Sequence, residues 1–190
     1  MSYRESREKL AGYRRQIATL REKMRGVQAA VEPEEVGDYE FAVPEGKTRL
    51  SALFGDQDTL FIIHNMGTGC AHCTMWADGF NGVFAHLSDR AAFVVSSPDP
   101  PERQQSFAAA RGWKFPMVSH QGTSFAADMG YVRDGGAMPG VSVFKRKGGK
   151  ILRVADTAFT GGDDFCSVWH LLDLLPEGAA GWQPKFSYGR

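Results

Sequence analysis

Two cysteines at Cys-x-x-Cys spacing, Cys70 and Cys73, are the residues of this chain best suited to covalent chemistry. A thiolate attacks disulfides and peroxides, and a second thiol nearby resolves the covalent intermediate. Cys70 is therefore the candidate nucleophile and Cys73 the candidate resolving cysteine. The third cysteine, Cys166, stands beside Phe165 and is interpreted as a small buried apolar residue.

The residues around the pair predict a strand, a sharp bend and a helix. Residues 61–63 are typical of a strand buried on both faces, and Gly67 and Gly69 permit a tight turn. After Cys73, apolar residues recur at helical spacing, namely Trp76, Phe80, Val83, Phe84 and Leu87. Cys70 is thus expected at a helix N-terminus, where unpaired N–H groups and the helix dipole lower a thiol pKa to roughly 3.5–7.5. This order of elements is the active-site arrangement of thioredoxin-like thiol proteins.

Two histidines near the cysteines are candidates for supporting roles. His64 ends the predicted strand six residues before Cys70, the spacing at which thioredoxins carry a buried acid. Its imidazole would take the proton from Cys73 as that thiol attacks; the alternative is a core histidine bonded to the backbone. His72 lies between the cysteines, and its protonated ring would stabilise the Cys70 thiolate. The alternative for His72 is a surface imidazole without a special role.

Four more residues are candidates for a substrate groove. Pro139 precedes a predicted strand, and we expect it to be the cis-proline that faces the cysteines in thioredoxin-like proteins. Met138 would then offer backbone groups to an incoming peptide or thiol. Trp76 is interpreted as a wall of the site. Thr68 is expected to hydrogen-bond the Cys70 sulfur or to cap the helix that follows.

Composition gives no support for a metal, a cofactor, nucleic acid or a membrane. A structural zinc site needs four ligands, and the chain has no second Cys-x-x-Cys and no His-x-x-x-His. A copper site made by the two cysteines and His120 or His170 is the alternative. With 22 Lys and Arg against 22 Asp and Glu, the zero net charge gives no general attraction to nucleic acid or anionic lipid. No apolar run approaches the ~20 residues of a membrane span.

The cysteine content and the polar start of the chain indicate a cytoplasmic protein. Three cysteines are too few for a disulfide framework, and the first residues are unlike a secretory signal. In a reducing cytoplasm, a Cys-x-x-Cys is more often catalytic or metal-binding than structural.

The chain is predicted to form a helical arm at residues 1–32, a domain at residues 38–178 and a tail at residues 179–190. The arm carries a heptad-like apolar stripe, interrupted only by Ser6, that comprises Tyr3, Leu10, Tyr13, Ile17, Leu20, Met24 and Val27. Basic residues that would repel in a self-pair flank this stripe, namely Lys9, Arg14, Arg21 and Lys23. We expect the arm to pack on its own domain or on an acidic surface of a neighbouring subunit, so a homodimer is one expected arrangement.

Strands and helices alternate over the predicted domain. A right-handed crossover would place the strands around Phe61 and Val94 side by side. Later, Gly148 and Gly149 predict the turn of a β-hairpin. We expect an α/β, thioredoxin-like fold with a mixed central sheet flanked by helices and a long N-terminal helical arm.

Two helices are expected beyond the cysteine helix. One begins near Pro100 and stops at Gly112. The last is expected at residues 163–175, with apolar residues on its buried side, namely Phe165, Val168, Trp169, Leu172 and Leu175.

Several separated segments together resemble a known family. They are Leu53-Phe-Gly, Ile63-His-Asn-Met, Cys70-x-x-Cys-x-x-Trp-Ala-Asp-Gly-Phe, Gly112-Trp-Lys-Phe-Pro, Gly140-Val-Ser-Val-Phe and Leu171-Leu-Asp-Leu. Over roughly residues 38–178 the chain resembles the thioredoxin-like family catalogued as domain of unknown function 899. The resemblance implies a thioredoxin-like fold related to the alkyl hydroperoxide reductase and thiol-specific antioxidant group, and it implies no settled substrate.

These features predict an enzyme, a thiol–disulfide oxidoreductase that acts on a disulfide-containing protein or a low-molecular-weight thiol. A thiol peroxidase is the alternative, weakened because Thr68 stands at the wrong spacing from Cys70 for the Pro-x-x-x-Thr-x-x-Cys pattern of peroxiredoxins. A third hypothesis is a non-catalytic thioredoxin-fold protein that binds partners or handles metal, with partner contact made by the arm.

Overall fold

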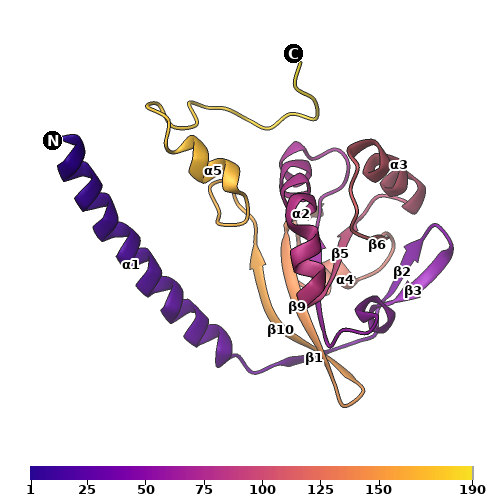
Figure 1. Ribbon diagram of the computed structural model, residues 1–190. Coiled ribbons are helices and arrows are strands. Elements are labelled where there is room, and N and C mark those ends of the chain that lie inside the picture. The colour runs from indigo at the N-terminus through magenta and orange to yellow at the C-terminus, as the bar shows by residue number, and fades with distance from the viewer. Residues whose placement is uncertain (190) are drawn as a thin grey trace. The chain divides into compact units, whose positions relative to one another are not determined.

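The computed structural model describes residues 1–189 (Figure 1). The chain divides into two compact units, Met1–Pro33 and Glu34–Arg190. No helix among the described residues is long and apolar enough to cross a membrane.

The first unit is a single helix, α1 (Tyr3–Ala29), as the apolar periodicity predicts. Its start is fixed by a capping box, because the Ser2 hydroxyl accepts the Glu5 N–H at 3.2 Å and the Glu5 carboxylate accepts the Ser2 N–H at 2.6 Å. No residue of α1 is buried, and the side chains of its apolar stripe are exposed by 46% (Ile17) to 83% (Tyr3). Which surface covers this stripe stays a prediction.

The second unit is built on a mixed eight-stranded sheet with the strand order β1-β10-β9-β4-β5-β6-β2-β3. The strands are β1 (Glu34–Val36), β2 (Glu40–Val43), β3 (Gly46–Arg49), β4 (Thr59–His64), β5 (Ala92–Ser97), β6 (Met117–Ser119), β9 (Gly140–Lys147) and β10 (Lys150–Ala158). Strand β4 pairs in parallel with β5 and antiparallel with β9. Phe61 lies opposite Phe93 and Ile62 opposite Val94, so the predicted neighbourhood of these strands is confirmed.

Helices cover both faces of this sheet (Figure 1). They are α2 (Ala71–Arg90), α3 (Pro101–Arg111), α4 (Phe125–Asp128), α5 (Ser167–Leu172) and the 3-10 helix η1 (Leu50–Phe54). Side chains alternate along β4, so Leu60 and Ile62 join the core that contains η1 and α4 residues. Ile63 points the other way and joins the core that contains residues of α2 and α5. The two faces of β4 therefore belong to different cores.

The turns around these elements follow the sequence signals. Gly148 and Gly149, with φ of 58° and 76°, form the tight turn between β9 and β10, which confirms the predicted hairpin. Helix α3 ends at Gly112, which adopts the left-handed conformation at φ 67°.

The last helix is shorter than predicted, because α5 spans Ser167–Leu172 and not residues 163–175. The Asp163 carboxylate accepts the N–H groups of Thr160 and Phe165, both at 3.0 Å, and so holds a turn where a helix was expected. Phe165 and Leu175 are exposed by 40% and 52%, so the predicted buried face does not include them. Cys166 is buried as predicted, but it precedes the helix as its N-cap.

Strand β3, strand β1 and one small hairpin were not predicted. Strand β1 pairs with β10, so the sheet begins before residue 38. The hairpin of β7 (Val132–Arg133) and β8 (Gly136–Ala137) forms a separate small sheet. Strands of two or three residues are too short to show an alternating pattern.

Candidate functional site

The loop between β4 and α2 is fixed by polar side chains on both of its flanks. Asn65 Oδ1 accepts the Gly67 N–H at 2.8 Å, and Asp99 Oδ2 accepts the Thr68 N–H at 2.6 Å. Gly67 has a φ of 99°, and a Cβ built there would lie 2.7 Å from Asp99 Oδ2. Only glycine permits this backbone conformation together with so close an approach.

Cys70 is the N-cap of α2, as predicted, and its sulfur accepts the Cys73 N–H at 3.1 Å. The side chain is partly exposed. The hydrogen bond from the Cys73 thiol, together with the backbone N–H groups of Cys73 and His72, lowers the pKa of Cys70 to about 7, against the effect of burial. A substantial fraction of Cys70 is therefore thiolate near neutral pH.

Cys73 lies one turn further into α2 and is only 2% exposed. Its hydrogen bond to Cys70 raises its pKa, as do burial and the negative charge of the Cys70 thiolate. Both cysteines are free thiols in this structure. The pair is thus asymmetric, with an ionisable outer thiol and a protonated inner one.

Thr68 does not cap α2, which corrects the prediction. The Cys70 sulfur takes the N–H that a capping side chain would accept, and within the described residues Thr68 Oγ1 is buried without a hydrogen-bond partner. The predicted alternative, a bond from Thr68 to the Cys70 sulfur, is likewise not formed.

His72 and Trp76 lie on the first turns of α2, next to α5. The His72 ring is centred 6.2 Å from the Trp76 ring and 6.2 Å from the Trp169 ring, nearly parallel to the latter at 24°. Trp76 is 3% exposed, and its Nε1–H donates to Asp163 Oδ1 at 3.2 Å. Whether His72 and Trp76 contact a substrate stays a prediction.

His64 points to the opposite face of the sheet, into the core that contains α4. Its ring is stacked 3.8 Å from the Tyr131 ring and 5.4 Å from the Phe125 ring, and its Nε2 lies 2.9 Å from Ser142 Oγ. Burial lowers the pKa of His64 to about 3, with smaller contributions from the charges of His120 and Arg153. The imidazole is therefore neutral near pH 7, and its Nδ1 has no partner among the described residues.

Gly140 makes room for this stacked arrangement. It lies opposite His64 in the β4–β9 pairing, and a Cβ there would sit 2.1 Å from Tyr131 Cε1 and 2.6 Å from the Thr157 carbonyl oxygen. The Tyr131 hydroxyl in turn donates to the Val141 carbonyl at 2.9 Å. The absence of a side chain at Gly140 therefore allows the tyrosine to lie against the strand.

Pro139 is not a cis-proline, which corrects the prediction, because no peptide bond is cis in residues 1–189. A trans X–Pro bond is favoured by ~0.5–1 kcal/mol unless the surroundings require otherwise. With the trans bond, the backbone groups on both sides of it are hydrogen-bonded. The Met138 N–H donates to the Tyr131 carbonyl at 2.9 Å, and the Pro139 carbonyl accepts the Phe159 N–H at 3.0 Å. The Met138 N–H is thus already occupied.

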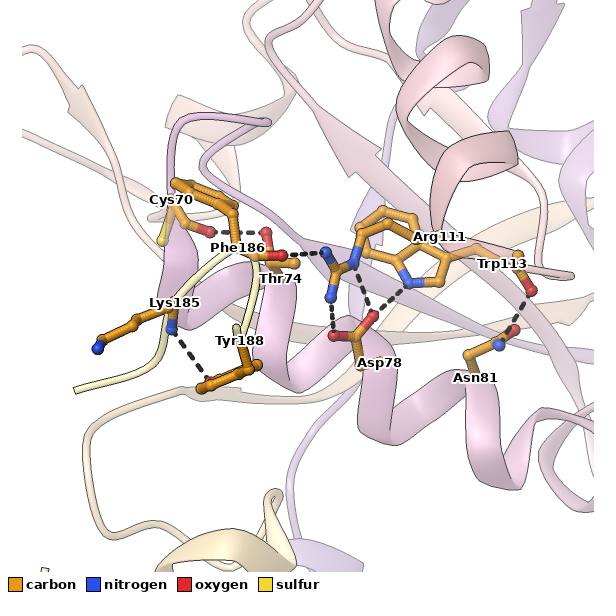
Figure 2. Close-up of polar contacts among 10 residues, drawn as sticks. Cys70, Thr74, Asp78, Asn81, Arg111, Trp113, Lys185, Phe186 and Tyr188 are labelled. Carbon is orange, nitrogen blue, oxygen red and sulfur yellow. Dashed lines mark hydrogen bonds and ion pairs between the residues drawn. The ribbon is translucent and has the colours of Figure 1, made fainter. Parts of the chain in front are cut away.

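A polar cluster that joins α2 to the end of α3 was not found from the sequence (Figure 2). Asp78 Oδ1 accepts Arg111 Nε–H at 2.9 Å and Trp113 Nε1–H at 2.8 Å, while Oδ2 contacts Arg111 Nη2. The Asp78 hydrogen bond raises the pKa of Arg111. Arg111 also donates to the Phe186 carbonyl at 3.0 Å, so the cluster holds the C-terminal tail.

The described residues offer no group of three or more His, Cys, Asp or Glu side chains that could hold a metal ion. Of the two histidines considered for copper, His120 Nδ1 lies 2.9 Å from Ser96 Oγ and His170 Nε2 lies 3.2 Å from Asp164 Oδ1.

The family model described as "Bacterial protein of unknown function (DUF899)" matches residues 3–186. The chain belongs to the DUF899 family. The family match includes α1, so it extends beyond the residues 38–178 on which the resemblance rests. No curated protein matches the sequence.

Several solved structures with a similar fold carry peroxiredoxin names. Peroxidoxin BcpB from Mycobacterium tuberculosis is 24% identical with a TM-score of 0.56, over 66% of this chain and 84% of that one. Peroxiredoxin Q from Xanthomonas campestris is 18% identical with a TM-score of 0.53, over 63% and 80% of the two chains. Reduced Prx3 from Vibrio vulnificus, in complex with hydrogen peroxide, is 10% identical with a TM-score of 0.55, over 68% and 88%. These likenesses confirm the thioredoxin-like fold of this DUF899 chain.

Proposed function

We propose that this DUF899 protein is a thiol–disulfide oxidoreductase whose redox pair is Cys70 and Cys73. The proposal rests on the difference in exposure and pKa between the two thiols. Cys70 is partly exposed with a pKa of about 7, whereas Cys73 is buried, has a raised pKa and donates its N–H to the Cys70 sulfur. A thiol that ionises near the ambient pH combines thiolate fraction with nucleophilicity, which suits it to attack a disulfide.

The reaction proceeds in two exchanges. The Cys70 thiolate attacks one sulfur of a substrate disulfide, the S–S bond breaks, and the departing thiolate takes a proton from water. This leaves a mixed disulfide on Cys70. Its formation removes the Cys70 charge, which is one cause of the raised pKa of Cys73. Cys73 then loses its proton and attacks the Cys70 sulfur, so the internal disulfide forms and the second substrate thiol leaves. Two electrons pass from the dithiol to the substrate.

The role of His64 in taking the Cys73 proton stays a hypothesis. Its free Nδ1 supports such a role, because a buried neutral imidazole nitrogen accepts protons. A pKa of about 3 weakens it, since a general base works best when its pKa lies near the working pH.

The substrate in this proposal is a disulfide-containing protein or a low-molecular-weight thiol in its disulfide form. We propose that it approaches Cys70 along His72, Trp76, Thr68 and the Met138-Pro139 segment, in a reducing cytoplasm. The strand pairing supports the Met138-Pro139 segment as part of this path. Gly140, which follows Pro139, lies opposite His64, and the loop that leads to Cys70 begins directly after His64.

A thiol peroxidase is the second candidate, favoured by the names of the structurally similar proteins. In that reaction the Cys70 thiolate attacks a peroxide oxygen, the O–O bond breaks, and an alcohol or water leaves. Cys73 then attacks the resulting sulfenic acid, water leaves, and the same internal disulfide forms.

Trapping of the first intermediate tests the proposal. The Cys73→Ser variant should accumulate a mixed disulfide on Cys70 when mixed with glutathione disulfide, and the Cys70→Ser variant should not. Second-order rates of wild-type oxidation by glutathione disulfide and by hydrogen peroxide then separate the two candidates. Faster oxidation by peroxide would favour the peroxidase, and failure of both oxidants to join Cys70 to Cys73 would overturn both.

A further inference from the structure

The C-terminal tail passes across the end of α2 that carries the cysteines. Its first anchor is the Trp182 ring, 6.0 Å from the ring of Trp169 on α5. Trp169 in turn lies 6.2 Å from the ring of His72, the residue between Cys70 and Cys73. The tail therefore starts beside α5, whose Trp169 lies near the first turn of α2.

The second anchor lies on the α3 side of α2, four residues further along. The Phe186 ring is 6.4 Å from the Phe107 ring at 87°, an edge-to-face contact. Phe107 also lines a small hollow together with Gly67 and Thr68, the residues that lead to Cys70. Figure 2 shows the Phe186 and Cys70 side chains at the same end of α2.

The Arg111 side chain binds the main chain of the tail. Asp78 holds the guanidinium with both carboxylate oxygens, which leaves Nη1 to donate to the Phe186 carbonyl at 3.0 Å. A carbonyl is present in every peptide unit, so this contact accepts any sequence. The Phe107 ring adds a preference for an aromatic side chain at the same position.

The segment after Pro184 is weakly held. Pro184 is buried, but every residue from 185 to 189 is exposed, including Phe186 at 44% and Tyr188 at 59%. These residues form no helix or strand. Segments with few buried contacts open at a low free-energy cost, so the tail can detach while the domain stays folded.

We propose that residues 185–188 occupy a binding subsite for an extended segment of a polypeptide substrate. In the absence of substrate the tail fills this subsite itself. A polypeptide replaces it, with a backbone carbonyl on Arg111 and an aromatic side chain on Phe107, which brings its disulfide to Cys70. This inference rests on the proposed function, and it names polypeptides as the favoured disulfide substrates.

Two variants with opposite expected effects test the subsite in the full-length protein. The probe is a synthetic peptide with a phenylalanine next to a cysteine in mixed disulfide with glutathione, and glutathione disulfide is the small comparison substrate. Phe186→Ala frees the tail but keeps the subsite, so the rate with the peptide should rise about fivefold, the factor for one lost aromatic pair. Arg111→Ala frees the tail and removes the carbonyl donor, so the peptide rate should fall below that of the wild type.

Controls distinguish a substrate-binding subsite from a tail that only shields Cys70. Arg90→Ala, at the other end of α2, is the matched control and should change neither rate. Replacing the probe's phenylalanine by alanine should remove the advantage gained in Phe186→Ala. Equal acceleration of peptide and glutathione disulfide in both variants would overturn the subsite, because a tail that merely covers Cys70 predicts that result.

Deuterium uptake distinguishes failure of the subsite from failure of the proposed function. If the wild type reduces neither disulfide, the oxidoreductase proposal fails. The reduced peptide should still speed deuterium uptake at residues 185–189 by displacing the tail, with no such change in Arg111→Ala. Uptake that the peptide leaves unchanged in the wild type would overturn the subsite.

Discussion

The carboxyl end of β4 separates two polar regions of opposite character. On one face, His64 is 2% exposed, lies between aromatic rings and has a pKa lowered to about 3. Beyond the strand, Cys70 is partly exposed and has a pKa lowered to about 7. His64 is thus held in its neutral form, and Cys70 in a form that readily becomes charged.

The difference between the two regions lies in their local hydrogen-bond donors. Burial opposes the charged form of both groups. At Cys70 the thiol and N–H of Cys73 and the N–H of His72 face the sulfur and outweigh burial. At His64 the ring has Ser142 as its hydrogen-bond partner, and positive charges of neighbours add to the effect of burial. The helix start therefore favours the charged form of Cys70, and the sheet core favours the neutral form of His64.

Replacing the nucleophile should have the largest effect. Cys70→Ser should abolish disulfide formation within the protein and exchange with glutathione disulfide, because no other exposed thiol replaces it. Thermal unfolding should stay close to that of the wild type, since the side chain is only partly buried and serine is also a good N-cap residue. The measurement is thiol titration after oxidation, with Cys166→Ala as the control that keeps full exchange.

A substitution on the His64 face should affect stability. Gly140→Ala places a Cβ 2.1 Å from Tyr131 Cε1, so the tyrosine must leave its stacked position. We expect a loss of ~1–3 kcal/mol in the free energy of unfolding, as is typical of overpacked sites. Urea unfolding measures it, with Gly37→Ala as a control because a Cβ there meets nothing within 4 Å. A Gly140→Ala protein as stable as the wild type would contradict the stacked arrangement.

The pH profile of Cys70 should depend on Cys73. In the wild type, alkylation by iodoacetamide should accelerate with rising pH through an inflection at about 7, because only the thiolate reacts. Cys73→Ala removes the thiol hydrogen bond that lowers the pKa most, so the inflection should move upward. An inflection that stays in place would assign the effect to the backbone N–H groups alone.

Acid should destabilise the protein gradually, through its buried histidines. His64 has a folded pKa of about 3 against a reference of 6.5, so between these values the unfolded chain binds a proton that the folded chain does not. Stability is therefore retained above about pH 6.5 and lost as the pH falls toward 3, by up to ~1.4 kcal/mol per pH unit for one proton. His64→Leu should make this slope shallower in urea unfolding at pH 4–7. The exposed His86→Gln on α2 is the matched control.

The sequence predicts those features that depend on neighbouring residues. The glycines before Cys70, the helix period after Cys73 and the pair Gly148-Gly149 each specify local conformation, and the structure follows them. The Thr68 prediction was wrong because the Cys70 sulfur accepts the same N–H. The last helix was predicted too long because the side chain of Asp163 stabilises a turn.

Features set by distant residues were not predictable. The trans bond before Pro139 lies in a segment held by Tyr131 and Phe159, and the contacts of Arg111 reach Asp78 and Phe186, 33 and 75 residues away. No periodicity or spacing in a single sequence reports such pairs. For the same reason the stacking of His64 between Tyr131 and Phe125 came only from the structure.

A redox titration of the cysteine pair tests the central claim most directly. The protein is equilibrated with glutathione buffers of graded potential, alkylated, and mapped by mass spectrometry. The account predicts one reversible two-electron transition, between about −270 and −120 mV, in which Cys70 and Cys73 join while Cys166 stays a thiol. Cysteines that remain free across the whole range, or a disulfide that includes Cys166, would contradict it.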